Sequence, residues 1–120
     1  MKVSIQKILE GQQIIASLLD KKLPAATAFR LGRLVSKVDS ELKLFDEQRM
    51  KIVQELGEEL AEEPGKFKIK EENVEKFNEE TKALLDVEIE IDVKQLSASE
   101  FGDVEISARE LLAIEWLVKE

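Results

Sequence analysis

Three acidic side chains at alternate positions form the first pattern in this sequence that could do chemistry. Glu88, Glu90 and Asp92 alternate with apolar residues in the stretch DVEIEIDVK, residues 86–94. Alternate side chains of a strand lie on one face, so these carboxylates could hold a hard cation such as Mg²⁺ or Ca²⁺. The same alternation is typical of any strand with one buried and one wet face. We favour the second interpretation and predict no metal site.

A group of basic residues is the second candidate. Arg30, Arg33 and Lys37 fall near one face of a predicted helix, shortly after Lys21 and Lys22. Arginines beside the N-terminus of a helix can bind a phosphate or a carboxylate. Arg30, Arg33 and Lys37 are therefore a candidate anion-binding site. The alternative is a solvated basic face that docks on the acidic middle of another copy.

The chain contains no histidine, cysteine or tyrosine. It therefore lacks the usual proton shuttle near neutral pH, the Ser-His-Asp type of triad, thiolate chemistry and the common zinc ligands. Disulfides are excluded for the same reason. We predict that the protein is not an enzyme and uses no cofactor.

Charge is unevenly distributed along the chain. The formal net charge is −8: residues 1–57 hold ten Lys and Arg against seven Asp and Glu, residues 58–92 hold five against thirteen, and residues 93–120 hold three against six. The acidic total argues against direct binding to nucleic acid, and the asymmetry can steer one copy onto another. The sequence also lacks the run of about 18 apolar residues that a membrane span needs and the pattern of a cleavable signal. We expect a cytoplasmic protein that does not bind membranes.

Apolar periodicity predicts a fold class that is mainly α with a small β part (α+β), in a single domain over residues 1–120. We expect a long central helix, a shorter N-terminal helix, a small antiparallel sheet of two or three strands and a short C-terminal helix. The predicted helices are residues 5–22, 24–62, 73–86 and 107–119, and the predicted strands are residues 66–70, 87–93 and 104–106.

Several residues mark the expected ends of these elements. Ser4 and Asn73 can cap the helices that follow them, and Pro24 separates the first helix from the second. The pair Pro64 and Gly65 is a strong breaker after the long helix. Ser107, with Glu110 three residues later, has the pattern of a capping box.

The long helix carries a continuous apolar seam. Its heptad spacing is typical of a coiled coil, and Arg49 is the polar residue in the seam, where it would set the register of a partner. A helix over residues 24–62 would be about 55 Å long, more than the short helices could cover. We predict self-association through Leu31, Val35, Val38, Leu42, Phe45, Arg49, Ile52 and Leu56, with Trp116 of the last helix as a further anchor. The alternative is that the seam packs on the chain's own helices.

Two further expectations concern close approach and pairing. Gly32 lies inside the long helix, where glycine is costly, so we expect another helix to pack closely against it. The strand at residues 87–93 needs a partner, and the candidates are residues 67–69 and residues 104–106.

The order of these segments resembles a family of small uncharacterised proteins encoded in tailed bacteriophages and prophages, often among structural and assembly genes. The resemblance covers nearly the whole chain and rests on LPAATAFRLGRLVSKVDSEL, EEPGKFKI, NVEKFNEETKALLDVEIEID and ISARELLAIEWLVKE. It implies a viral protein made in the cytoplasm of a bacterial host cell, either free or associated with the virion. The resemblance implies no catalytic or binding residue for this chain.

Two functions remain open at this point. The first is a non-enzymatic phage protein that acts through self-association and protein–protein binding, as an assembly factor, a minor structural component or an adaptor. Its partners would be copies of itself and a phage structural or host protein. The second is a counter-defence protein that inhibits a host factor, either by acidic mimicry of nucleic acid or by sequestering an anionic ligand.

Overall fold

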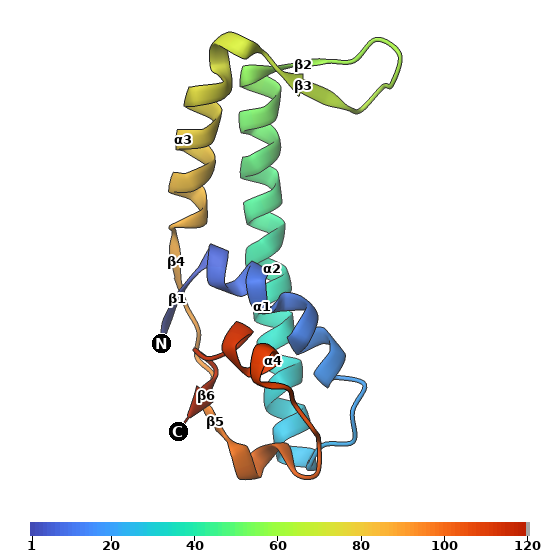
Figure 1. Ribbon diagram of the computed structural model, residues 1–120, viewed down its shortest axis with the longest axis vertical. Helices are drawn as coiled ribbons and strands as arrows, with labels where there is room; N and C mark the ends of the chain where they lie inside the picture. The colour runs from blue at the N-terminus through green and yellow to red at the C-terminus, as the bar shows by residue number, and fades with distance from the viewer. Residues whose placement is uncertain (120) are drawn as a thin grey trace.

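The computed structural model describes residues 1–119 as an elongated molecule with one long helix as its axis (Figure 1). Its extents are 51 × 27 × 24 Å. The long helix α2 (Ala25–Leu56) is accompanied by α1 (Ile5–Leu18), α3 (Val74–Leu85) and α4 (Ala108–Ala113). Two short 3₁₀ helices, η1 (Glu71–Asn73) and η2 (Ala98–Phe101), precede α3 and follow β5. The predicted fold class, mainly helical with a small β part, is confirmed.

The strands form three separate pairs. β1 (Lys2–Ser4) pairs antiparallel with β4 (Glu88–Glu90), β2 (Gly57–Glu59) pairs antiparallel with β3 (Phe67–Ile69), and β5 (Leu96–Ser97) pairs parallel with β6 (Val118–Lys119). The prediction of one antiparallel sheet is therefore wrong, and so are both predicted partners of residues 87–93. The helix α3 keeps β3 and β4 about 18 Å apart along its axis, and residues 104–106 form no strand.

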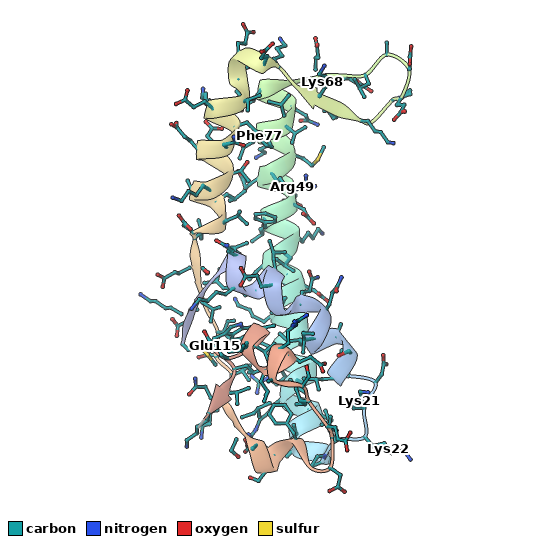
Figure 2. All side chains as sticks on the ribbon, viewed as in Figure 1. Lys21, Lys22, Arg49, Lys68, Phe77 and Glu115 are labelled. Atoms are coloured by element: carbon teal, nitrogen blue, oxygen red, sulfur yellow. The ribbon has the colours of Figure 1, made fainter. Side chains whose placement is uncertain are left out.

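The molecule has two parts, which we call the base and the stalk. The base consists of residues 1–45 and 87–119, in which α1, α4 and the flanking strands lie beside the N-terminal part of α2 (Figure 1) and cover one face of it. The stalk consists of residues 46–86, in which the rest of α2 packs on α3 and on the β2–β3 hairpin, which forms the tip. Figure 2 shows Lys21 and Lys22 at the free end of the base and Lys68 at the tip.

Burial differs sharply between these parts. Within residues 1–119, the only buried apolar side chain of the stalk is that of Leu56. The core lies in the base, and its fully buried side chains are Ile8, Leu31, Leu34, Ile91, Leu96, Ile114 and Leu117.

The long helix ends earlier than residue 62, because its last carbonyl is capped from outside the helix. The Leu56 carbonyl accepts hydrogen bonds from the Lys70 N–H at 3.2 Å and from Asn73 Nδ2 at 3.1 Å. Asn73 was predicted to cap the helix that follows it, but its side chain instead caps the C-terminus of α2. The chain then leaves α2 in extended conformation at Gly57.

Among the other helix boundaries, two predicted N-terminal caps are confirmed and two predicted C-terminal ends are wrong. The cap at Ser4 is confirmed by its hydrogen bond from the Lys7 N–H at 3.2 Å, and the capping box of Ser107 and Glu110 is confirmed by two bonds of 3.1 Å. The C-terminal ends were predicted too late. The first helix stops at residue 18 rather than 22, and the last stops at residue 113 rather than 119, where the chain turns toward β6.

Gly11, rather than Gly32, lies at a close helix approach. A Cβ atom on Gly11 would lie 2.8 Å from the Ala113 carbonyl oxygen and 3.0 Å from Ile114 Cγ2, where α1 meets α4. A Cβ atom on Gly32 would have no neighbour within 4 Å, so the expected close approach at Gly32 is wrong.

These two glycines give a matched test of the fold. Gly11→Ala should lower the free energy of unfolding by about 1–3 kcal/mol, because the helices must separate to admit the methyl group. Gly32→Ala should raise it by about 0.5–1 kcal/mol, because alanine favours a helix interior. Urea unfolding measures both changes. Equal effects at the two positions would contradict the packing of α1 on α4.

Candidate functional site

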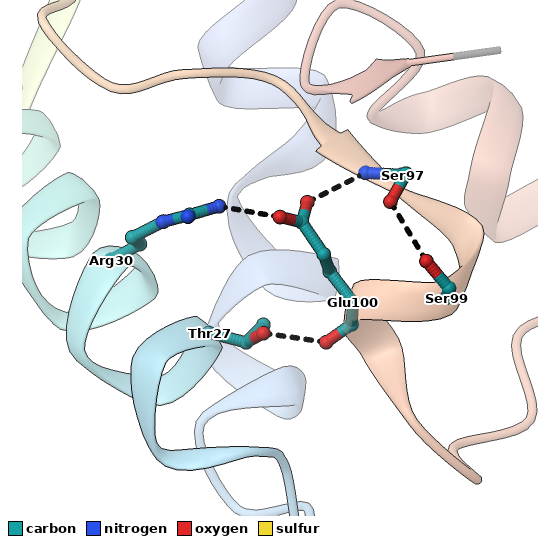
Figure 3. A network of polar contacts seen from close by, with 5 residues as sticks. All are labelled: Thr27, Arg30, Ser97, Ser99 and Glu100. Atoms are coloured by element: carbon teal, nitrogen blue, oxygen red, sulfur yellow. Dashed lines mark hydrogen bonds and ion pairs between the residues drawn. The ribbon is translucent and has the colours of Figure 1, made fainter.

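Glu100 is the centre of the main polar network (Figure 3). Its carboxylate accepts a hydrogen bond from the Ser97 N–H at 2.8 Å and pairs with Arg30 Nη1 at 2.8 Å. Its backbone carbonyl accepts from the buried Thr27 hydroxyl at 2.5 Å. The Ser97 and Ser99 hydroxyls are 3.1 Å apart. The network therefore fastens η2 to the first turns of α2.

These bonds favour the charged form of Glu100. The Ser97 N–H, followed by the Arg30 guanidinium, holds the pKa of the Glu100 carboxyl below its ordinary value of 4.5. Carboxylates that accept such bonds ionise more readily because the donors stabilise the negative charge. Glu100 therefore carries a negative charge in the folded protein, and its carboxylate is the ion-pair partner of Arg30.

The predicted anion-binding residues already lie beside carboxylates. Besides the Arg30 pair, Lys37 Nζ lies 2.9 Å from Glu41 Oε1. Arg33 and Lys37 line a shallow depression of about 340 Å³ that Glu90 and Asp92 also line. This mixture of charges disfavours an anion site at Arg30, Arg33 and Lys37.

Arg33 also contacts an aromatic ring. Its guanidinium lies 6.0 Å from the centroid of the Phe29 ring, at the outer limit of a cation–π interaction. Phe29 itself is 68% exposed.

Most of the predicted self-association seam faces the chain's own core. The buried members are Leu31, Val38, Leu42, Phe45 and Leu56. In the first turns the buried face is displaced by one residue, so that Leu34 and Thr27 are buried while Val35 is only half-buried and Ala28 is exposed. The displacement follows from the 3.6-residue turn of a straight helix, which drifts from a strict seven-residue repeat. Self-association stays a prediction, but these five residues cannot carry it in the folded chain.

The remaining predicted residues are more accessible. Arg49 is 44% exposed at its side chain and lies 3.8 Å from Asp46 of the same helix, and Ile52 is half-buried in the stalk. Trp116 is half-buried and packs against the core of the base. The accessible predicted residues of the seam are therefore Arg49 and Ile52 in the stalk and Val35 in the base.

An apolar groove marks the junction of base and stalk. It encloses about 110 Å³ between α2, the end of α3 and β4. Leu44 and Val87 at its rim are 57% and 47% exposed. Its lining is Ile5, Glu41, Leu44, Phe45, Gln48, Leu84, Val87 and Ile89. Sequence patterning missed this groove because Leu44 lies outside the heptad positions and Val87 was assigned to the buried face of a strand.

Residues 1–119 contain no group of three or more acidic side chains arranged to hold a metal ion. None of the helices in this range is both long and apolar enough to cross a membrane.

Comparison with known proteins found no matching family model, no matching curated protein and no matching solved structure. The functional argument therefore rests on the surface of this molecule.

The polar network predicts a pH-dependent contribution to stability. Because the pKa of Glu100 is lowered in the folded state, its contribution is present above the ordinary value of 4.5 and is lost as the pH falls through the folded-state value. Glu100→Gln should therefore lower Tm at neutral pH, and its difference from the natural protein should shrink as the pH falls below 4.5. Thermal unfolding monitored by circular dichroism across this range measures the difference.

Glu105→Gln is the matched control for this experiment. Glu105 is exposed on the following segment, so its substitution should leave Tm nearly unchanged at neutral pH. A Tm difference for Glu100→Gln that stays constant across the pH range would contradict the role of the ionised carboxylate.

Proposed function

We propose that this protein is a non-enzymatic component of a tailed bacteriophage or prophage that acts by self-association and protein–protein binding, as an assembly factor, minor structural component or adaptor. The viral setting rests on the resemblance of its segment order to that family. The binding role rests on the exposed surface of the folded chain, and we take a second copy of the chain as the first partner.

The excess of exposed surface is the observation that carries the proposal. The chain exposes 8439 Å². A compact monomer of 13.7 kDa would expose about 6,600 Å². The excess of about 1,800 Å² is more than the roughly 800 Å² that each partner contributes to an interface of standard size. The radius of gyration of 17.6 Å likewise exceeds the value of about 13.6 Å expected for a compact domain of 120 residues.

The stalk leaves many of its apolar side chains incompletely buried. Stalk helices of this length are marginal by themselves, and most helical stability comes from packing an apolar face. Yet α3 has no buried side chain, and Val74 at its start is 43% exposed. The half-buried apolar side chains of the stalk are Met50, Ile52, Val53, Leu60, Phe67, Ile69, Phe77, Leu84 and Leu85. A second copy on this surface would complete their burial.

Charge supports association between unlike parts of two copies. Residues 57–73 place six glutamates and three lysines at the tip of the stalk, a net charge of −3, whereas Lys21 and Lys22 lie at the free end of the base (Figure 2). Such a distribution raises the rate of productive encounters at low salt and opposes contact between like ends.

Absolute mass in solution tests the proposal. Light scattering on a sizing column should give a multiple of 13.7 kDa, with weaker association as the salt concentration rises. A mass that stays at that of one chain at every accessible concentration would contradict self-association.

The groove at the junction predicts which surface side chain matters. Leu44→Glu should weaken association at least about tenfold, because it places a charge on an apolar contact. Leu112→Glu is the matched control, since Leu112 is a 68% exposed leucine on α4, away from the stalk. Both variants should keep the helical circular dichroism of the natural chain. Equal association of the two variants would show that the groove lies outside the interface.

A further inference from the structure

The outer edge of β4 has free backbone groups. At the inner edge, the Ile5 N–H donates to the Val87 carbonyl at 2.9 Å and the Ile91 N–H donates to the Met1 carbonyl at 2.8 Å. Hydrogen-bonded positions alternate along an antiparallel pair, so the groups of Val87, Ile89 and Ile91 face β1. The N–H and C=O groups of Glu88 and Glu90 therefore face outward, away from β1.

The outer edge of β3 is free in the same way. The Leu60 N–H donates to the Lys66 carbonyl at 2.9 Å and the Lys70 N–H donates to the Leu56 carbonyl at 3.2 Å. By the same alternation, Lys68 faces β2, and the N–H and C=O groups of Phe67 and Ile69 face outward.

The side chains of these two strands are complementary. β4 and its neighbours read VEIEID over residues 87–92, and β3 and its neighbours read KFKIK over residues 66–70. Each strand alternates apolar and charged side chains, with carboxylates on one strand and ammonium groups on the other. Phe67 and Ile69 are half-buried, and Lys68 is exposed.

We infer that β3 of one copy adds in parallel to the outer edge of β4 of a second copy. This inference rests on the proposed self-association and names its contact. Within one chain the two strands cannot meet, because α3 separates them (Figure 1). The free edges therefore belong to contacts between copies.

The backbone pattern selects the parallel direction. In a parallel pair, a residue whose groups point toward the partner lies beside a residue whose groups point away. Glu88 then lies beside Lys68, Ile89 beside Ile69, and Glu90 beside Lys70. In an antiparallel pair, the outward residues would lie opposite each other, which would place Glu88 beside Phe67 or Ile69 and mix the polar and apolar faces.

Pairing of β4 with β4 of a second copy is disfavoured by charge. It would place Glu88 and Glu90 of two copies on adjacent strands, where like charges destabilise the pair. Addition of β3 instead provides main-chain hydrogen bonds and apolar cover, while the ion pairs set the register.

The absence of native cysteine gives a direct test by cross-linking. We would mix Lys68→Cys chains with Glu88→Cys chains under mild oxidation and measure covalent heterodimer by mass spectrometry. Adjacent strands lie about 4.8 Å apart, within reach of a disulfide after small adjustments. The heterodimer should form at least about tenfold faster than in a mixture of Lys68→Cys with Leu112→Cys chains, whose second cysteine is also at an exposed position. Equal rates in the two mixtures would overturn the inference.

Charge reversal gives an independent test. Lys68→Glu and Glu88→Lys should each weaken association at least about threefold, and mixing the two variants should restore it as a heterodimer. Rescue by mixing separates loss of a contact from loss of folding, because a misfolded chain would not be rescued. Failure of mixing to restore association, with both variants folded, would overturn the inference.

The outcomes also separate this inference from the proposed function. A natural chain that is monomeric would overturn both. A natural chain that is oligomeric, but in which residues 68 and 88 neither cross-link preferentially nor rescue each other, would overturn only the strand contact.

Discussion

The length of one uninterrupted helix is the constraint on which the rest of this structure depends. The chain keeps α2 helical for 32 residues, which corresponds to about 48 Å of helix. The other helices have 14, 12 and 6 residues, so they can surround only part of it. The division into a covered base and a thinly covered stalk follows directly.

The base is stabilised by contacts between residues far apart in the sequence. The N-terminal strand pairs with β4, α1 packs closely on α4 at Gly11, and the Glu100 network fastens η2 to α2. The stalk, which consists of α2, α3 and the hairpin between them, buries fewer apolar side chains than the base. A segment with few buried apolar side chains opens more easily than the core, and a partner that covers it stabilises it by mass action. We therefore regard the stalk as the part of the molecule whose stability depends most on association.

Local signals in the sequence predicted much of the fold. The helix caps at Ser4 and Ser107 depend on neighbouring residues only, and both are present in the structure. The long helix was recognised from its apolar seam, although a strict heptad placed Val35 rather than Leu34 in the core. Strand pairing was predicted wrongly because it depends on long-range contacts. Residues 2–4 are too few to show alternation, and they nevertheless pair with β4.

The surface proposed for self-association was only partly predictable from the sequence, because it too depends on long-range contacts. The seam indicated that α2 needs cover, but not which turns the chain covers itself. Arg30 and its neighbours resembled an anion site in sequence, yet Glu100, seventy residues later, pairs with Arg30. Complementarity between residues 66–70 and 87–92 was visible as two alternating stretches, whereas the outward direction of their backbone groups required the observed pairings.

The central claim is that a second copy covers the stalk, and amide hydrogen exchange measured at high and low protein concentration tests it most directly. The account predicts that protection of residues 46–56 and 74–86 increases with concentration, while protection of α1 in the base stays constant. Protection of the stalk that is independent of concentration, in a chain that remains monomeric, would contradict it.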